Sequence, residues 1–460
     1  MSILSLNDSL STTDTTFETV TVDINSIPLS LYIHIPWCVK KCPYCDFNSH
    51  ELAGDHSLTK YEEYVDALIL DAMSQQPLAQ GRKISSIFIG GGTPSLLPIT
   101  QYQRLFAQLR QYFDFACDIE ITMEANPGTL EHAPFAEYLA VGINRLSIGV
   151  QSFAADKLVA LGRIHDPDQA LSAIRAARSA GFERVNVDLM HGLPKQSLQE
   201  ALYDIQRAHD AGATHISWYQ LTIEPNTVFY RSQPLLPDED NLADIEAAGQ
   251  SLLQQLGYEN YEVSAWVGAS DQACRHNLNY WQFGDYLAIG AGAHGKVSIN
   301  KDVVKIEPSI FTTLASIDSM DSRFVFDDGV YRFSKSRLPK DYMAKIDNVD
   351  RVYSGSDTSN YNSNDQQSDS DALLLHPPKM IDWHVIPKDE MVSEFMLNVL
   401  RLNKGVPWSL FEARTGLSLG EIDTQITSLI NQGLLEKSSK ILQPTDLGRR
   451  YLNQILKAFL

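Results

Sequence analysis

Apolar and polar positions follow a repeating strand-then-helix pattern over the first 260 residues of the chain. Short apolar runs typical of buried strands occupy 29–35, 84–90, 119–125, 145–151, 184–190 and 215–223. Stretches with helical periodicity follow them at 59–75, 100–112, 131–140, 168–180, 197–211 and 241–256. Six such units predict an α/β fold with parallel strands and right-handed crossovers. A partial (β/α) barrel and an open doubly wound sheet both satisfy this pattern.

The remaining segments depart from this pattern and suggest the domain organisation. Residues 1–28 are rich in Ser, Thr, Asp and Asn and predict a flexible tail before a barrel domain at 29–300. After a connecting segment at 301–349, residues 350–380 are too polar to offset the entropy of ordering, and we expect a disordered insertion. Helical periodicity returns over 381–460 and predicts a small, mostly helical domain.

The C-terminal domain contains a segment, residues 421–435, that resembles the second helix and turn of a winged-helix module. This helix contains no Lys or Arg, whereas a DNA-recognition helix needs cations for phosphates and bases. The formal net charge of −20 also argues against nucleic acid and anionic lipid as direct partners. We therefore expect no nucleic-acid binding.

The sequence shows no targeting segment. It has no apolar run of about 18 residues, and its polar N-terminus lacks the features of an export signal, so neither a transmembrane segment nor secretion is expected. Clustered cysteines that act as metal ligands require a reducing compartment. We therefore expect a cytoplasmic protein.

Three of the five cysteines lie in one short loop after the first predicted strand. Cys38, Cys42 and Cys45 have the spacing C-x3-C-x2-C, and thiolates suit an iron-sulfur cluster or zinc. A structural zinc site normally has four ligands, and no second cysteine pair follows. Three thiolates on a [4Fe–4S] cluster would leave one iron open to a small molecule.

This loop, with Tyr44 before its last cysteine, resembles the cluster motif of the radical S-adenosylmethionine (SAM) enzymes. The resemblance implies that SAM binds the open iron. Glycines at 90–92 follow the second strand and resemble the glycine motif of that superfamily. It implies SAM contacts for Gly91, Gly92 and Thr93.

Polar residues at three further strand ends resemble one branch of this superfamily, the branch of oxygen-independent coproporphyrinogen III oxidase. Glu124, Gln151 and Asp188 end the third, fourth and fifth strands, and Arg163 and Tyr32 also match that branch. The resemblance implies a partial (β/α)6 barrel with a C-terminal cap. Carboxylates suit the ammonium and ribose hydroxyls of SAM, while Gln151 and Arg163 suit its carboxylate and ribose. The number of SAM sites stays open.

Two features separate this chain from the oxidase. Phe47 stands where the oxidase carries a further cysteine, and residues 276–281 match H-N-x-x-Y-W, the haem-binding motif proposed for HemW-type haem chaperones. The match implies haem contacts for His276, Asn277, Tyr280 and Trp281. A histidine is a common axial ligand, and the two aromatic rings suit a flat macrocycle. The alternative is a buried His/Asn pair that stabilises a loop.

The two other cysteines have weaker interpretations. Cys274, next to the motif, is an alternative thiolate ligand for haem, although a lone buried cysteine is usually a small apolar residue. Cys117 precedes the third predicted strand, so we expect it at the opposite end of the barrel from the cluster, and we assign it no function.

Two functions are consistent with these features. The first is a haem chaperone that carries a cluster and SAM and delivers haem to haem-requiring respiratory proteins, membrane-bound ones included. The second is a coproporphyrinogen III oxidase. Phe47 and the haem motif favour the chaperone, whereas the retained SAM residues would serve an enzyme. Whether SAM is cleaved and whether the chain forms a homodimer stay open.

Overall fold

The computed structural model describes residues 19–52, 58–129, 135–304, 326–344 and 381–460. The expected insertion at 350–380 and residues 1–18 of the expected tail lie outside this part of the chain, as do residues 131–134 of the third predicted helix.

The six predicted strands are present and form the parallel centre of one sheet. They are β1 (Leu29–Ile35), β4 (Ile84–Gly91), β5 (Phe115–Ala125), β6 (Arg145–Gln151), β7 (Arg184–His191) and β8 (His215–Gln220), and each pairs with the next in this order. The α/β class is therefore confirmed. Most apolar residues of these strands are buried, as expected for a sheet covered by helices.

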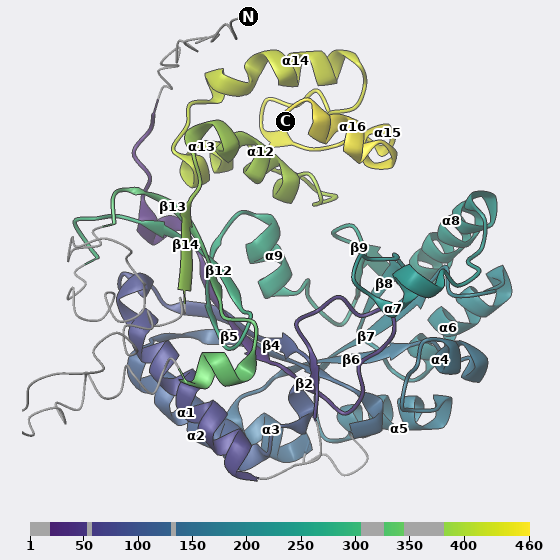
Figure 1. The fold of residues 1–460 in the computed structure, drawn as a ribbon. Coiled ribbons are helices and arrows are strands. Elements are labelled where there is room, and N and C mark those ends of the chain that lie inside the picture. The colour runs from purple at the N-terminus through teal and green to yellow at the C-terminus, as the bar shows by residue number, and fades with distance from the viewer. Residues whose placement is uncertain (1–18, 53–57, 130–134, 305–325, 345–380) are drawn as a thin grey trace, which may run out of the picture.

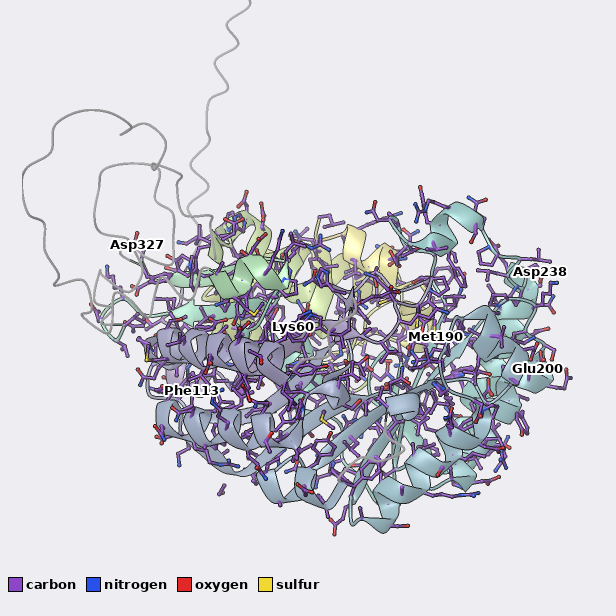
Figure 2. The ribbon with its side chains drawn as sticks, turned by 60° about the horizontal axis from the view of Figure 1, so that its bottom comes forward. Lys60, Phe113, Met190, Glu200, Asp238 and Asp327 are labelled. Atoms are coloured by element: carbon purple, nitrogen blue, oxygen red, sulfur yellow. The ribbon has the colours of Figure 1, made fainter. Side chains whose placement is uncertain are left out.

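Helices connect these strands on the outer side of the sheet. They are α1 (Leu58–Gln75), α2 (Ile99–Tyr112), α3 (Phe135–Val141), α4 (Ala155–Ala160), α5 (Pro167–Ser179) and α6 (Leu198–Asp210). After β8 follow α7 (Val228–Ser232) and α8 (Glu239–Gln255), and α8 packs beside α6. Two of the connecting helices begin at complete capping boxes, α5 at Asp166 and α6 at Ser197, where each cap side chain accepts an N–H that the helix leaves unpaired. Figure 2 shows this layer, with Phe113 after α2 and Glu200 in α6 on opposite sides of the molecule.

The sheet extends beyond these six strands on both sides. β11 (Asp285–Ile289) pairs parallel to β1, and β12 (His294–Ile299), β13 (Gly329–Lys335) and β14 (Ile381–Val385) continue the sheet with antiparallel pairings. On the other side, β10 (Ala265–Gly268) and β9 (Tyr258–Asn260) are antiparallel additions to β8. Residues 329–335 thus belong to the sheet rather than only connecting two domains. Within the described residues β14 and β9 are unpaired edges, so the barrel is open.

One short helix, α9 (Arg275–Trp281), lies on the inner side of the sheet against β1 and β4 (Figure 1). The C-terminal helices α12 (Lys388–Val399), α13 (Ser409–Thr415), α14 (Asp423–Asn431), α15 (Asp446–Arg450) and α16 (Leu452–Lys457) lie beyond it, with a two-stranded sheet of β15 (Val406–Pro407) and β16 (Ile441–Leu442). Phe283, just after α9, is buried in the same apolar core as Phe395 and Phe411 of this domain. The C-terminal domain therefore covers the side of the barrel that holds α9.

Residues 19–28, expected to belong to a flexible tail, pack against the C-terminal domain. Thr19 forms a β-bridge with Leu417, and the N–H of Val20 donates to the carbonyl of Gly416 at 2.8 Å. Ile27 is buried. Polar composition predicted a tail here because the pattern of these residues does not reveal a distant partner. Among the described residues, no helix combines the length and apolar character needed to cross a bilayer.

Candidate functional site

The three clustered cysteines lie in a loop that leaves the end of β1. This loop is held by a short parallel pairing of β2 (Trp37–Cys38) with β3 (His50–Glu51). Cys38, Cys42 and Cys45 are all free and half-buried, and they line one cavity of about 480 Å³, here called the cluster cavity.

Each cysteine sulfur has a polar neighbour. The hydroxyl of Thr93 lies 3.4 Å from the Cys38 sulfur, a guanidinium nitrogen of Arg163 lies 3.7 Å from that of Cys42, and the Ser49 hydroxyl lies 3.5 Å from that of Cys45. Donors at these distances stabilise thiolates, which are the form that binds metal.

The spacing of these side chains bears on the kind of metal centre. In the described part of the chain, no three His, Cys, Asp or Glu side chains gather around one position as ligands of a single ion would. A [4Fe–4S] cubane has no such requirement, because each thiolate binds a different iron. The three thiols, facing one cavity beside hydrogen-bond donors, fit a cluster of this kind.

The cluster cavity brings together eight of the nine residues that the sequence associated with SAM. They are Tyr44, Gly91, Gly92, Thr93, Glu124, Gln151, Arg163 and Asp188. They come from loops and strand ends of β1, β4, β5, β6 and β7, at the carboxyl edge where parallel sheets hold ligands. Tyr32 does not line this cavity. Asn277, predicted to contact haem, does.

Close contacts with the end of β1 and the start of the cysteine loop require glycine at the end of β4 and directly after it. Gly91 has φ +113°, a conformation that other residues rarely adopt, and a Cβ there would lie 2.5 Å from Cε1 of His34. A Cβ on Gly92 would lie 2.5 Å from the carbonyl oxygen of Trp37. The backbone of β4 therefore packs directly on the start of the cysteine loop, and larger residues would push the two apart.

Two buried carboxylates, Glu124 and Asp188, face the cluster cavity from adjacent parts of the rim. Burial, then the charge of Asp188, raises the pKa of Glu124 to about 8, although the N–H of Gly91 at 3.2 Å opposes this shift. Burial also raises the pKa of Asp188, against hydrogen bonds from Asn186 and Ser147. Such a pair is stabilised by a bound cation, and the ammonium group of SAM is a cation of suitable chemistry.

A second cavity of about 600 Å³ adjoins the first, and Phe47, Gly91 and Glu124 line both. We call it the aromatic cavity. Its inner wall contains stacked rings: Phe88 lies 4.9 Å from His276 between centroids, at an interplanar angle of 26°, and 6.4 Å from Tyr32 at 20°. Phe88 could not be identified from the sequence, because a single aromatic residue in an apolar strand looks like core.

Three histidines line the aromatic cavity, and their ring nitrogens differ in availability. His34 donates from Nε2 to the carbonyl of Asn48 at 2.9 Å, so its Nδ1 accepts from the Tyr32 hydroxyl at 2.9 Å. His294 is exposed at the edge of the cavity. His276 has a buried Nδ1 without a hydrogen-bond partner among the described residues, and burial lowers its pKa to about 4. His276 is therefore a neutral imidazole with an unused nitrogen.

The other residues of the haem motif are dispersed. Tyr280 lines the aromatic cavity beside His276. Trp281 lines neither cavity: its ring packs on the core of the C-terminal domain, and the Arg401 guanidinium lies 5.1 Å from its centroid. The structure therefore does not bring Trp281 together with His276 and Tyr280, because α9 directs residues five positions apart in sequence, 276 and 281, toward different neighbours.

The two remaining cysteines lie away from both cavities. Cys274 is buried, its sulfur lies 3.4 Å from a carboxylate oxygen of Glu120, and burial raises its pKa to about 12. It stays a thiol, so the thiolate alternative for a haem ligand is not supported. Cys117 is exposed and lies within β5 rather than before it, because that strand begins at Phe115.

Comparisons with known proteins match both parts of the chain. The radical SAM superfamily model matches residues 32–208, and the HemN C-terminal domain model matches residues 386–451. Heme chaperone HemW of Escherichia coli (strain K12) is 43% identical over 434 residues, which cover 94% of this chain and 98% of that relative. Heme chaperone HemW of Haemophilus influenzae is 42% identical over 438 residues, with the same coverage of both chains. This chain belongs to the HemW family.

The fold of this HemW family member is also found among solved structures. Coproporphyrinogen III oxidase (HemN) from Escherichia coli aligns with a TM-score of 0.69 over 94% of this chain and 90% of its own, at 22% sequence identity. At that identity the likeness concerns the fold, and it confirms the partial barrel with a C-terminal helical domain.

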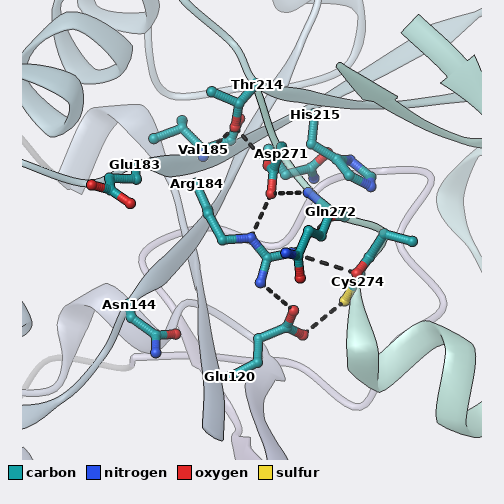
Figure 3. Close-up of polar contacts among 12 residues, drawn as sticks. Glu120, Asn144, Glu183, Arg184, Val185, Thr214, His215, Asp271, Gln272 and Cys274 are labelled. Atoms are coloured by element: carbon teal, nitrogen blue, oxygen red, sulfur yellow. Dashed lines mark hydrogen bonds and ion pairs between the residues drawn. The ribbon is translucent and has the colours of Figure 1, made fainter. Parts of the chain in front are cut away.

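In this chain, the start of α9 is held by a buried ion-pair network that the sequence did not reveal (Figure 3). Glu120 accepts backbone N–H groups from Arg275 at 2.9 Å and from His276 at 3.3 Å. Its other oxygen pairs with Arg184 at 2.6 Å, and Arg184 pairs with Asp271 at 2.5 Å. Burial would raise the pKa of Glu120, but nearby cationic guanidinium groups outweigh burial and lower it. The network fixes the position of His276.

Proposed function

We propose that this chain is a haem chaperone that carries a [4Fe–4S] cluster and SAM beside the haem it transports. One observation carries the proposal: a neutral His276 lines the aromatic cavity, next to stacked rings and directly beside the cluster cavity. Imidazole is a common axial ligand of haem iron, and flat apolar rings suit a porphyrin. A volume of about 600 Å³ lies within the usual range of cofactor sites.

The resident cofactors in this proposal have a matching set of side chains. Cys38, Cys42 and Cys45 would hold the cluster, and Glu124 and Asp188 would hold the ammonium and ribose of SAM. When bound, the cluster supplies electrons and an open iron to which SAM coordinates. Arg163 and Thr93 would lie beside the cysteine sulfurs that hold the cluster and exclude water from them.

The position of Phe47 supports a carrier over an oxidase. Its side chain is 65% exposed and lines both cavities, where the oxidase resemblance would place a cysteine. Phenylalanine supplies no acid, base or thiol to a reaction at this position. It does supply apolar surface next to a bound macrocycle.

The partners and location follow from the same proposal. Haem would be the cargo and haem-requiring respiratory proteins the acceptors, membrane-bound ones included. All five cysteines are free thiols, which suits the cytoplasm. A homodimer would be compatible with transfer of haem to an acceptor protein, and a transfer experiment would identify that acceptor.

The experiment combines two assays on anaerobically reconstituted protein. Protein with cluster, SAM and reductant is incubated with coproporphyrinogen III, and haem-loaded protein is incubated with a haem-free respiratory enzyme. We expect no protoporphyrinogen IX in the first assay and restored enzyme activity in the second, faster than from an equal concentration of haem–albumin. Turnover of coproporphyrinogen III at an enzymatic rate would favour the oxidase, and restoration no faster than from albumin would contradict a chaperone.

A further inference from the structure

The aromatic cavity has an apolar inner end and a polar opening. Phe88, Tyr32 and His276 form the inner end. The exposed residues that line it are here called the cavity mouth, and they are Asp46, Phe47, Tyr280, His294 and Arg337. Haem has the same polarity, because both propionates leave one edge of an otherwise apolar ring. The mouth is therefore where carboxylates of a bound haem would emerge.

Arg337 is held in place by its backbone while its guanidinium stays available. Its carbonyl oxygen accepts from Nδ2 of Asn48 at 2.9 Å and from Nε2 of His50 at 3.3 Å, which ties the end of β13 to the cysteine loop. The guanidinium is exposed and forms no ion pair with a described residue.

Two cations of β13, just before Arg337 in the chain, are already engaged. Lys335 lines the aromatic cavity but pairs with the buried Asp71, and Arg332 pairs with Glu394. Within the described residues lining this cavity, Arg337 is the cation whose charge no carboxylate neutralises.

The carboxylates near the cavity mouth reduce the positive potential around Arg337 only slightly. Asp46 is exposed, so water screens its charge. Glu124 lies at the boundary with the cluster cavity, and burial raises its pKa to about 8, so it is mostly protonated at neutral pH. A chain with a net charge of −20 would otherwise repel a dianionic ligand, which makes a local cation more important here.

We propose that Arg337 binds a propionate of haem held in the aromatic cavity, with His294 as a second donor. This inference rests on the proposed haem-carrying function. A guanidinium matches a carboxylate with two parallel N–H bonds, a geometry that fixes orientation as well as binding. Clamping the propionates at the mouth would direct the apolar edge of the macrocycle toward the inner end, where His276 lies.

The state of His294 is consistent with the second donor role. Burial and then the charges of Arg337 and Arg332 lower its pKa, so the ring is neutral near pH 7 and donates one N–H. His294 and Arg337 line the same cavity.

The test compares haem with its dimethyl ester, in which both propionates are uncharged. Each is titrated into wild type, Arg337→Ala and the control Lys340→Ala, in the same dilute detergent at low and high salt. Lys340 is an exposed cation nearby in sequence that does not line the cavity. The substitution keeps the Arg337 carbonyl that Asn48 and His50 bind, and the side chain is exposed, so the variant should fold.

We expect Arg337→Ala to weaken haem binding by about tenfold at low salt and to leave binding of the ester unchanged. Wild-type haem binding should weaken at high salt, and Lys340→Ala should behave as wild type. Equal loss of both ligands in Arg337→Ala, or no loss of either, would overturn the propionate site while leaving the haem function intact. A wild type that binds neither ligand would overturn both.

Discussion

Glu124 is a buried carboxyl group between the two cavities, and its protonation affects the stability of the empty protein. Its pKa is raised from an ordinary value of 4.5 to about 8, so the native state binds this proton more tightly than the unfolded state. Its contribution to stability is therefore greatest below about pH 4.5 and falls as the pH rises to about 8. Asp188 has a raised pKa as well and acts in the same direction.

Glu124→Gln keeps the shape of the protonated side chain but removes this titration. In cluster-free protein without SAM, we expect the variant to match wild type near pH 5 and to be more stable at pH 9 by a few kcal/mol, since one pKa unit corresponds to about 1.4 kcal/mol. Urea unfolding across this range measures the difference. Parallel stability curves for the two proteins would show that Glu124 is already ionised in the native state.

The three loop cysteines should be individually required for the cluster. Cys38→Ala, Cys42→Ala or Cys45→Ala each removes the thiolate that would bind a separate iron. The iron content after anaerobic reconstitution should therefore fall from about four atoms per chain to near none. Cys117→Ala is the matched control, because this thiol is exposed on β5 and lines neither cavity. Iron loss in the control, with iron retained in the loop variants, would disprove the ligand assignment.

Helix α9 depends on a single carboxylate from a neighbouring strand. Glu120→Ala would leave the N–H groups of Arg275 and His276 without their acceptor and Arg184 without one partner, so we expect a loss of about 3–5 kcal/mol in unfolding free energy. Asp118→Ala is the control, because Asp118 pairs with Arg275 at the surface, where water screens the pair, and its loss should change stability little. Equal, small losses in both variants would contradict a role for Glu120 in holding α9.

The elements that the sequence predicted well are those with a local signal. Strands β1, β4, β6 and β7 begin at the predicted residue and end within one residue of prediction, because both faces of each are covered and the apolar run is continuous. The start of β5 was placed four residues late, since residues 115–118 mix aromatic, small and charged side chains. The cysteine loop was predictable for the same reason: its spacing is local.

The elements and site residues that the sequence missed depend on long-range pairing. β11 pairs with β1 although the two strands are more than 250 positions apart in the sequence. β13 joins the sheet from residues 301–349, which the sequence predicted only as a connecting segment. Glu120 belongs to no motif, and it acquires its role only in the folded chain, where the start of α9 lies beside β5. Of the haem motif, His276 and Tyr280 line one cavity, whereas helical geometry directs Trp281 elsewhere, which the linear motif does not reveal.

At the scale of the whole molecule, Trp281 connects the barrel to the C-terminal domain. Trp281→Ala removes a ring that packs on that domain's core and contacts Arg401, so we expect a loss of about 2 kcal/mol in unfolding free energy with haem affinity unchanged. Tyr280→Ala, one residue earlier but lining the aromatic cavity, should show the reverse: weaker haem binding and a smaller stability loss. Chemical denaturation and haem titration of both variants measure this. Reduced haem affinity in Trp281→Ala without a stability change would return Trp281 to the haem site.

The central claim is that His276 contacts haem in the cavity beside the cluster, and an anaerobic haem titration followed by the Soret band tests it most directly. The control is His384→Ala, which removes an exposed histidine on β14 and reports on nonspecific haem binding. His276→Ala should shift the Soret maximum and weaken binding by at least about tenfold, while His384→Ala leaves both unchanged. A His276→Ala protein with the spectrum and affinity of wild type would contradict this location of the haem site.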